Sequence, residues 1–265
     1  MGDESSEGRR PGQMKASWAE GHSITAGLPE RLPDWLLGVS RRRPRWDQVA
    51  RRGEPHGRPM RVDWGRTLRR WARTGHSDGS VVWRRMPHGP GRLVVLWDVS
   101  GSMAGYVEWY FPWLYRLVHE RPDVYVFGFG TAVADLSDPL RASYTEAVRR
   151  LYEEPSLWGS GTAIGQAFKE WNRRFGRRLL GSSTRLVIIS DGWDVGNPDD
   201  LESALLGMAH RLREIWWVNP LMVTAGFEAK TRALKIALHY TQHMEAGATI
   251  DGLRALSWKF GVGVR

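Results

Sequence analysis

Residues 93–103 have the sequence LVVLWDVSGSM, which is the part of the chain most informative about its fold. Its apolar half is rich in β-branched residues, which is typical of a buried strand bounded by a Gly/Ser turn. Asp98 ends the strand, and the hydroxyls of Ser100 and Ser102 follow at alternate positions. Oxygen atoms at the carboxyl end of a parallel strand lie where α/β sheets bind ligands. They are hard ligands, which favour Mg²⁺ or Mn²⁺ over zinc or copper.

Two later segments carry oxygen atoms in the same kind of place. Residues 158–162 (WGSGT) open a helical pattern with Thr162, and residues 185–192 (RLVIISDG) form a second buried strand followed by Asp191. The first segment taken alone fits a simple helix cap equally well, because Ser and Asp are common at turns and helix N-termini. The three segments together favour a metal site.

The order Asp-x-Ser-x-Ser, Thr, Asp makes the chain resemble the von Willebrand factor A (VWA) family over roughly residues 91–220. The resemblance implies a metal-ion-dependent adhesion site in which hydroxyls bind the ion directly and aspartates bind it directly or through water. Carried over to this sequence, its members are Ser100, Ser102, Thr162, Asp98 and Asp191. Neutral hydroxyls quench little of the ion's charge, so an open coordination position is expected to attract a carboxylate of another protein.

Further strings narrow the resemblance to the CoxE-like subgroup of bacterial VWA proteins, over roughly residues 61–225. They are TLR at 67–69, SDGWDVGNP at 190–198, MAHRLR at 208–213 and IWWVNPL at 215–221. The resemblance implies an adaptor that works with a MoxR-type AAA+ ATPase in maturing a client metalloenzyme, such as molybdenum-containing carbon monoxide dehydrogenase. Residues 226–265 match the subgroup less clearly.

Two residues that follow Asp191 in the same loop are candidates for partner binding. Trp193 and Asp194 are expected beside the metal, on the rim that faces a partner. Tryptophan is a common interface anchor, while an aspartate here can tune metal selectivity or cap the following turn.

Catalysis by this chain alone is not expected. Haloacid-dehalogenase-like phosphatases use Asp-x-Asp at a strand end, but Ser100 holds the second position here and has no useful acid–base pKa. No Gly-Lys dipeptide is present for a P-loop, and Ser102 lacks the flanking glycines of a hydrolase elbow. His239 and His243 have the spacing of a zinc pair, but Tyr240 replaces the glutamate of a metalloprotease motif, which favours solvated or packed helix histidines.

Composition narrows the class of protein. The 265 residues can build one substantial core, and the lack of cysteine excludes disulfides, thiolate metal sites and cysteine nucleophiles. No apolar run reaches the roughly 18 residues of a membrane span. Residues 1–7 (MGDESSE) lack the basic start and apolar stretch of a signal peptide. We therefore expect a cytoplasmic protein without a membrane span.

The net charge of +9 lies entirely in residues 1–92, which hold 19 Lys and Arg against 10 Asp and Glu. It is concentrated in residues 41–52, and tryptophans are interleaved with the arginines. We expect residues 1–60 to form a partly disordered Arg/Pro/Trp-rich extension and residues 61–265 to form the VWA-like domain with an N-terminal arm. The extension is expected to dock on an acidic protein surface. Binding of nucleic acid is the less favoured alternative, because no nucleic-acid-binding fold accompanies the arginines.

The apolar pattern from residue 92 onward alternates strands with helices. Strands are expected near 92–98, 123–129, 184–190 and 214–219, with a weaker one near 131–136. This alternation predicts a doubly wound α/β fold of the VWA or Rossmann-like type, with a mostly parallel sheet and helices on both faces. Before the domain, a short helix capped by Asp63 is expected to pack Trp64, Leu68 and Trp71 onto it. Residues 80–85 are expected to form an edge strand or an extended arm.

Overall fold

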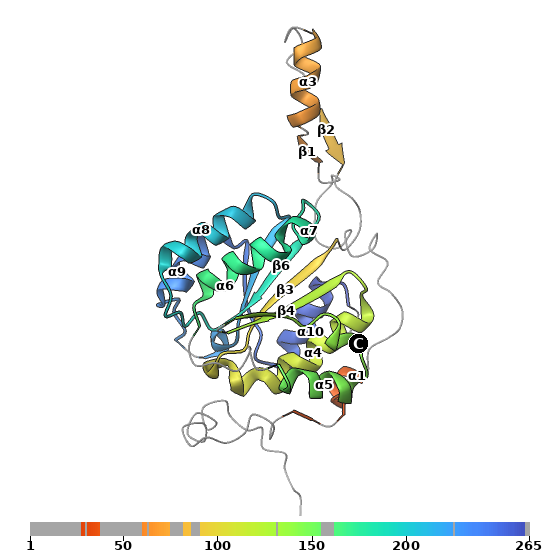
Figure 1. Cartoon of the computed structure of the whole chain (residues 1–265), viewed down its shortest axis with the longest axis vertical. Helices are drawn as coiled ribbons and strands as arrows, with labels where there is room; N and C mark the ends of the chain where they lie inside the picture. Colours follow the sequence, from red (N-terminus) through yellow and green to blue (C-terminus); the bar gives the residue numbers. More distant parts are fainter. Residues whose placement is uncertain are drawn as a thin grey trace, which may run out of the picture.

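The structure of the chain is a computed structural model that describes residues 28–29, 31–37, 60–62, 64–74, 82–85, 91–130, 132–154, 162–224 and 226–262. Its centre is a six-stranded sheet with the strand order β5-β4-β3-β6-β7-β8 (Figure 1). All neighbouring strands are parallel except β5, which is antiparallel to β4. The strands are β3 (Leu93–Asp98), β4 (Val124–Phe129), β5 (Val133–Asp135), β6 (Arg185–Ile189), β7 (Glu214–Asn219) and β8 (His243–Ala246).

Helices cover both faces of this sheet, as Figure 1 shows. One face carries α1 (Asp34–Leu37), α4 (Val107–Glu120), α5 (Tyr144–Tyr152) and α10 (Ile250–Lys259). The other carries α6 (Ile164–Trp171), α7 (Arg177–Leu179), α8 (Pro198–Ala209) and α9 (Arg232–Tyr240). Shorter helical segments are η4 (Gly101–Tyr106), η5 (Pro139–Arg141), η7 (Asn172–Gly176) and η8 (Pro220–Val223). The predicted doubly wound α/β fold is confirmed.

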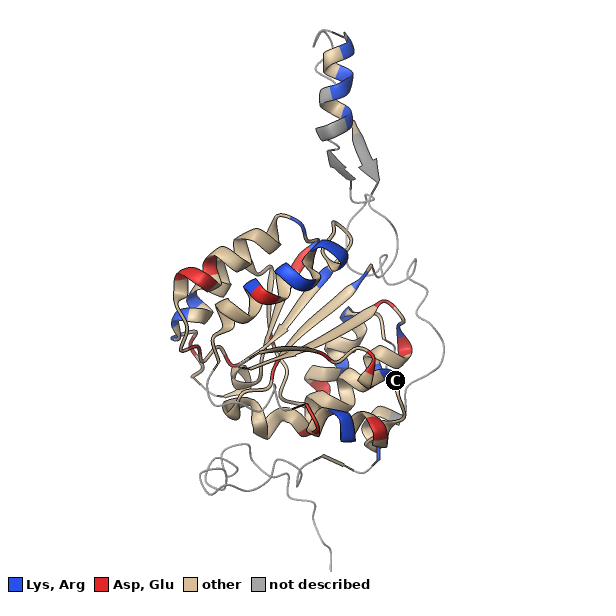
Figure 2. Cartoon of the chain, viewed as in Figure 1, with Lys and Arg blue, Asp and Glu red and all other residues tan. Residues whose placement is uncertain are grey.

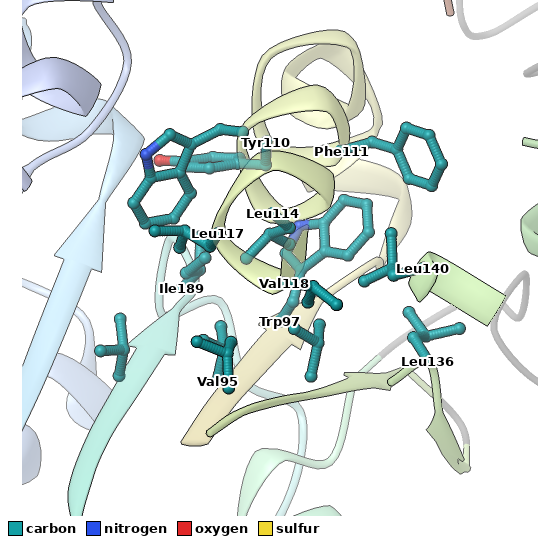
Figure 3. Packing of buried hydrophobic residues seen from close by; sticks show 14 of the residues in the cluster. Val95, Trp97, Tyr110, Phe111, Leu114, Leu117, Val118, Leu136, Leu140 and Ile189 are labelled. Atoms are coloured by element: carbon teal, nitrogen blue, oxygen red, sulfur yellow. The ribbon is translucent and has the colours of Figure 1, made fainter. Parts of the chain in front are cut away.

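Strand β3 runs through the middle of the core and is buried along its whole length. Because side chains alternate across a strand, Val95 and Trp97 face one layer of helices while Val94 and Leu96 face the other. In Figure 3, Val95 and Trp97 pack beneath α4. Burial on both faces explains why the sequence of this strand is one continuous apolar run.

Within the described residues, no helix has both the length and the apolar character needed to cross a bilayer.

The expected strands β3, β4, β6 and β7 are present within one residue of their predicted bounds, but β8 was not anticipated. Helix α9 ends at Tyr240, and His243 is the first residue of β8, so the prediction of two histidines on one helix is wrong for His243. Its ring stacks on Trp216 at 3.7 Å, and its Nε2 atom lies 3.6 Å from Glu214. The two histidines therefore lie on different elements and do not form the helical pair.

Part of the predicted N-terminal extension packs on the domain. Leu36 of α1 is fully buried in the core cluster that contains β3 and α4. Trp35 lies against Trp109 of α4, with 6.4 Å between ring centroids. A boundary at residue 60 therefore does not separate the domain from everything that precedes it. The arginine-rich residues 41–52 lie outside the described residues.

A small structural unit lies between α1 and β3 in the sequence. Strands β1 (Met60–Val62) and β2 (Trp83–Arg85) form an antiparallel pair, and α3 (Trp64–Thr74) connects them. The backbone N–H of Val82, just before β2, donates a hydrogen bond of 2.9 Å to Thr67 Oγ1, which ties the helix to the strand pair. Figure 1 shows this unit standing apart from the six-stranded sheet, in contrast to the expected packing of the helix on the domain. The side chains of Trp64 and Leu68 lie outside the described set.

Candidate metal centre

The candidate site lies at the carboxyl edge of the sheet, where β3 and β6 end side by side. The chain leaves β3 for β4 on one side and later returns to β6 on the other. This is the topological switch point at which α/β sheets bind ligands. The register pairs Trp97 with Ile189, so Asp98 lies opposite Ser190. The Ser190 hydroxyl donates a hydrogen bond of 2.7 Å to Asp98 Oδ2.

The structure brings Asp98, Ser100 and Ser102 together, as the sequence predicts. Asp98 is fully buried, and its Oδ1 atom accepts a hydrogen bond of 2.9 Å from the backbone N–H of Ser100. The hydroxyl oxygens of Ser100 and Ser102 are 3.2 Å apart. Ser102 is exposed at the start of η4, so this cluster of oxygens opens from the buried strand toward the surface.

Thr162, in the segment just before α6, and Asp191, in the loop after β6, lie at the same edge of the sheet. Thr162 is 2 % exposed, and its buried Oγ1 atom has no hydrogen-bond partner among the described residues. The backbone N–H of Val195 donates to the Thr162 carbonyl at 3.0 Å, which ties the start of α6 to the loop that carries Asp191. Asp191 is 4 % exposed, and its charge acts on Asp98.

Asp98 and Asp191 place two negative charges at this edge of the sheet, which is electrostatically unfavourable. The pKa of Asp98 is raised to about 6, mainly by burial and to a smaller extent by the charge of Asp191, while the hydrogen bonds from Ser190 and Ser100 oppose the rise. Burial and Asp191 also raise the pKa of Tyr106. A bound cation would remove this repulsion.

The donor set fits a hard divalent cation and is poor in charge. Across the described part of the chain, no three His, Cys, Asp or Glu side chains gather into a group that could hold a metal ion. An ion at the carboxyl edge would therefore depend on hydroxyl ligands as well as on two carboxylates. Such an all-oxygen set suits Mg²⁺ or Mn²⁺.

Three residues that the sequence analysis assigned no role hold this arrangement in place. Ser190 bonds directly to Asp98, and Trp217 Nε1 donates to the Ser190 carbonyl at 3.0 Å. Asn219 is fully buried, and its Nδ2 atom donates to the Asp191 carbonyl at 3.1 Å. Ser190, Trp217 and Asn219 lie within strings that carried the family resemblance, but their roles follow only from the contacts that the end of β6 makes with β3 and β7.

The loop from Asp191 to Asn197 is held by hydrogen bonds of Asp194 and exposes two apolar side chains. Asp194 Oδ1 accepts hydrogen bonds from the backbone N–H groups of Ile164, at 3.0 Å, and of Gly196, at 2.8 Å. Asp194 therefore closes the turn that follows it and also caps the first turn of α6. Trp193 is 66 % exposed and Val195 is 80 % exposed, so both side chains face solvent beside the site.

Several solved structures are similar to this chain. A von Willebrand factor type A protein from Catenulispora acidiphila has 17% identity, with 68% of this chain and 42% of that chain covered and a TM-score of 0.42. BatB from Bacteroides thetaiotaomicron has 17% identity, with 64% and 96% covered and a TM-score of 0.42. Proximal thread matrix protein 1 from the mussel byssus, with a zinc-occupied MIDAS motif, has 15% identity, with 64% and 46% covered and a TM-score of 0.42. The chain thus spans less than half of the Catenulispora protein. No curated protein matches it.

A family model settles the relationship. The model described as "VWA domain containing CoxE-like protein" matches residues 30–252. The match includes the buried α1 segment, the whole six-stranded sheet and all five candidate metal ligands. The chain belongs to the family of VWA domain containing CoxE-like proteins.

Proposed function

We propose that the carboxyl edge of the sheet binds one Mg²⁺ or Mn²⁺ ion and, through it, a carboxylate of a partner protein. The hydroxyls of three residues would bind the ion directly, and two carboxylates would bind it directly or through water. These residues are Ser100, Ser102, Thr162, Asp98 and Asp191. The ion would supply a strong positive charge with an open coordination position.

One observation carries this proposal, namely the buried hydroxyl of Thr162 that has no hydrogen-bond partner among the described residues. A buried polar group without a partner costs about 1–3 kcal/mol. Such a group needs an explanation, and an ion ligated by Thr162 Oγ1 provides one. The nearby carboxylates of Asp98 and Asp191 favour a cation at the same edge.

The rim of the site supplies a contact surface for the partner. Trp193 and Val195 project from a loop whose backbone is held by Asp194, so their exposed side chains are presented without loss of much conformational freedom. We assign Trp193 as the partner-contacting residue. Asp194 would act on partner binding by positioning the loop, since its Oδ1 atom is occupied by two backbone groups.

The family membership supports a particular kind of partner. A CoxE-like chain would act as a non-enzymatic adaptor for a MoxR-type AAA+ ATPase in the cytoplasm and help it mature a client metalloenzyme. In this role the ion does no chemistry. The ion would join the adaptor to a carboxylate of the partner, and the ATPase would supply the energy for maturation.

Calorimetric titration of the purified chain with Mg²⁺ and Mn²⁺ tests the site. We expect one binding site per chain, weakened at least about tenfold by Thr162→Val or Ser102→Ala, because each removes one ligand without changing charge. Ser182→Ala removes an exposed hydroxyl in the turn before β6 and is the matched control. Unchanged affinity in a Ser102→Ala/Thr162→Val double variant would overturn the proposal.

Capture of a purified MoxR-type ATPase tests the adaptor role separately. Binding is expected in Mg²⁺ and lost in chelator, and it should fail in the variants that lose the ion. An ion site without Mg²⁺-dependent capture would leave the metal assignment standing and refute the adaptor.

A further inference from the structure

The amino end of the sheet, opposite the metal centre, carries a second unusual surface. Six arginines gather where α7 ends and where β3 and β7 begin, and we call them the arginine end. They are Arg92, Arg173, Arg177, Arg178, Arg211 and Arg213. Figure 2 shows the concentration of basic residues on α7 at this end of the domain.

Hydrogen bonds place several of these arginines around the same short helix. Arg92 Nη1 donates to the carbonyls of Arg178 and Leu179, at 2.8 and 2.9 Å. Arg211 Nη2 donates to the carbonyl of Gly176 at 2.8 Å. These two guanidinium groups satisfy carbonyls at a helix C-terminus, which is a structural role.

The remaining arginines have no such structural role. Arg173, Arg177, Arg178 and Arg213 are exposed, and within the described residues none of them forms an ion pair or a side-chain hydrogen bond. The carboxylates nearest in the sequence are already engaged by other arginines. Glu170 pairs with Arg174 at 3.0 Å, and Glu214 pairs with Arg185.

A cluster of like charges with no acidic partner does not stabilise a folded domain, since its members repel one another. The same cluster would stabilise a complex with an acidic surface and would speed its formation. We propose that the arginine end binds an acidic surface of a second partner protein. This proposal is independent of the metal centre.

An acidic protein fits this surface better than a nucleic acid does. Proteins that bind single strands combine basic grooves with exposed aromatic platforms for the bases. The exposed large aromatic side chains of the described residues are Trp193, at the carboxyl edge, and Trp258, on α10 at the opposite face of the sheet. The arginine end therefore offers guanidinium forks, which match carboxylates, without a platform for bases.

The two ends of the sheet leave room for two partners at once. Strand β3 has six residues and is therefore about 20 Å long, at about 3.3 Å per residue. A protein that binds the metal edge need not touch the arginine end. The domain would then link a carboxylate-bearing partner to an acidic one.

The test uses the full chain with two fluorescent probes, a peptide of alternating Asp and Glu and an RNA of equal charge number. The variant is Arg177→Gln/Arg178→Gln. Its matched control is Arg149→Gln/Arg150→Gln, a second tandem arginine pair on α5, which is already ion-paired with Glu146. Both variants lose the same charge and keep the arginines of residues 41–52.

At physiological ionic strength we expect the Arg177/Arg178 variant to bind the peptide about tenfold more weakly than wild type, and the control to lose less than about twofold. Binding should persist in chelator, which separates this surface from the metal centre, and wild type should bind the peptide more tightly than the RNA. Equal losses in the two variants would overturn the proposal. Tighter binding of the RNA would identify a nucleic-acid surface and would also overturn it.

Discussion

The substitution Asp98→Asn tests the electrostatics of the carboxyl edge, because it removes one charge and keeps the shape of the side chain. The metal-free protein must hold Asp98 and Asp191 together in a buried place. We therefore expect Asp98→Asn to stabilise the metal-free fold at neutral pH while it weakens binding of the ion. A change that stabilises the fold but removes function is characteristic of a site built for a ligand.

The magnitude follows from the pKa of Asp98, which rises from 3.8 to about 6 on folding. At about 1.36 kcal/mol for each pKa unit, burying the charged form lowers the free energy of unfolding by about 3 kcal/mol. The Ser190 hydroxyl, which donates to Asp98 Oδ2, must turn to accept from the new amide, and this costs about 1 kcal/mol. We expect a net gain of about 2 kcal/mol for the variant in chelator.

The sign of the pH dependence is fixed by the direction of the pKa rise. The folded state holds the proton more tightly than the unfolded state, so protonation of Asp98 stabilises the fold below its unfolded pKa of 3.8. That stability is lost as the pH rises through about 6. The advantage of Asp98→Asn should therefore be full above about pH 7 and should vanish near pH 4.

Urea unfolding of wild type and variant, in chelator and in Mg²⁺, measures these differences. Asp251→Asn is the control, since that carboxylate is 94% exposed at its side chain. Mg²⁺ should stabilise wild type and the control, and should stabilise Asp98→Asn much less. A variant that is less stable than wild type in chelator at neutral pH would refute the electrostatic reasoning.

Two further predictions concern α1 and the rim of the site. Leu36→Ala should lower the free energy of unfolding by about 2–4 kcal/mol, because Leu36 is fully buried, while Asp34→Ala on the exposed side of the same helix should change it little. Urea unfolding measures both, and equal stabilities would show that α1 is not part of the core. Trp193→Ala should reduce ATPase capture at least about tenfold and leave the melting temperature nearly unchanged, because this side chain is 66 % exposed. Trp258→Ala, at a second exposed tryptophan, should leave capture intact, and a large loss of stability in Trp193→Ala would instead place that residue in the core.

Strands that are buried on both faces could be predicted from the sequence, and the edge strand β8 could not. β3 and β6 are continuous apolar runs because helices cover both of their faces. β8 has the sequence HMEA, and all four residues are only half-buried. It therefore shows neither an apolar run nor an alternation of buried and exposed residues. It forms because β7 offers a free edge with which to pair.

The packing of α1 on the domain could not be predicted from the sequence around it. Leu36 lies in a stretch rich in proline, arginine and tryptophan, where a local pattern suggests an extension. Its burial depends on α4, more than seventy positions later in the chain, and a single short helix gives no periodicity to reveal it.

The candidate ligands could be predicted because each stands at the end of a recognisable element. Asp98 ends one buried strand and Asp191 follows another, and parallel strands end at the same edge. The residues that support them could not be predicted in the same way. Asn219 acts through a contact with Asp191 that depends on the register of β7 against β6, and Asp194 acts on Ile164 thirty positions earlier.

The most direct test of the metal centre is a crystal structure of the protein with Mn²⁺, with the ion located by its anomalous scattering. We expect one strong peak among the hydroxyl oxygens of Ser100, Ser102 and Thr162, in reach of Asp98 and Asp191. The peak should be absent from crystals of Thr162→Val grown in the same way. The absence of a peak at this edge in wild type, or a peak coordinated by other residues, would show that these five residues do not form the metal site.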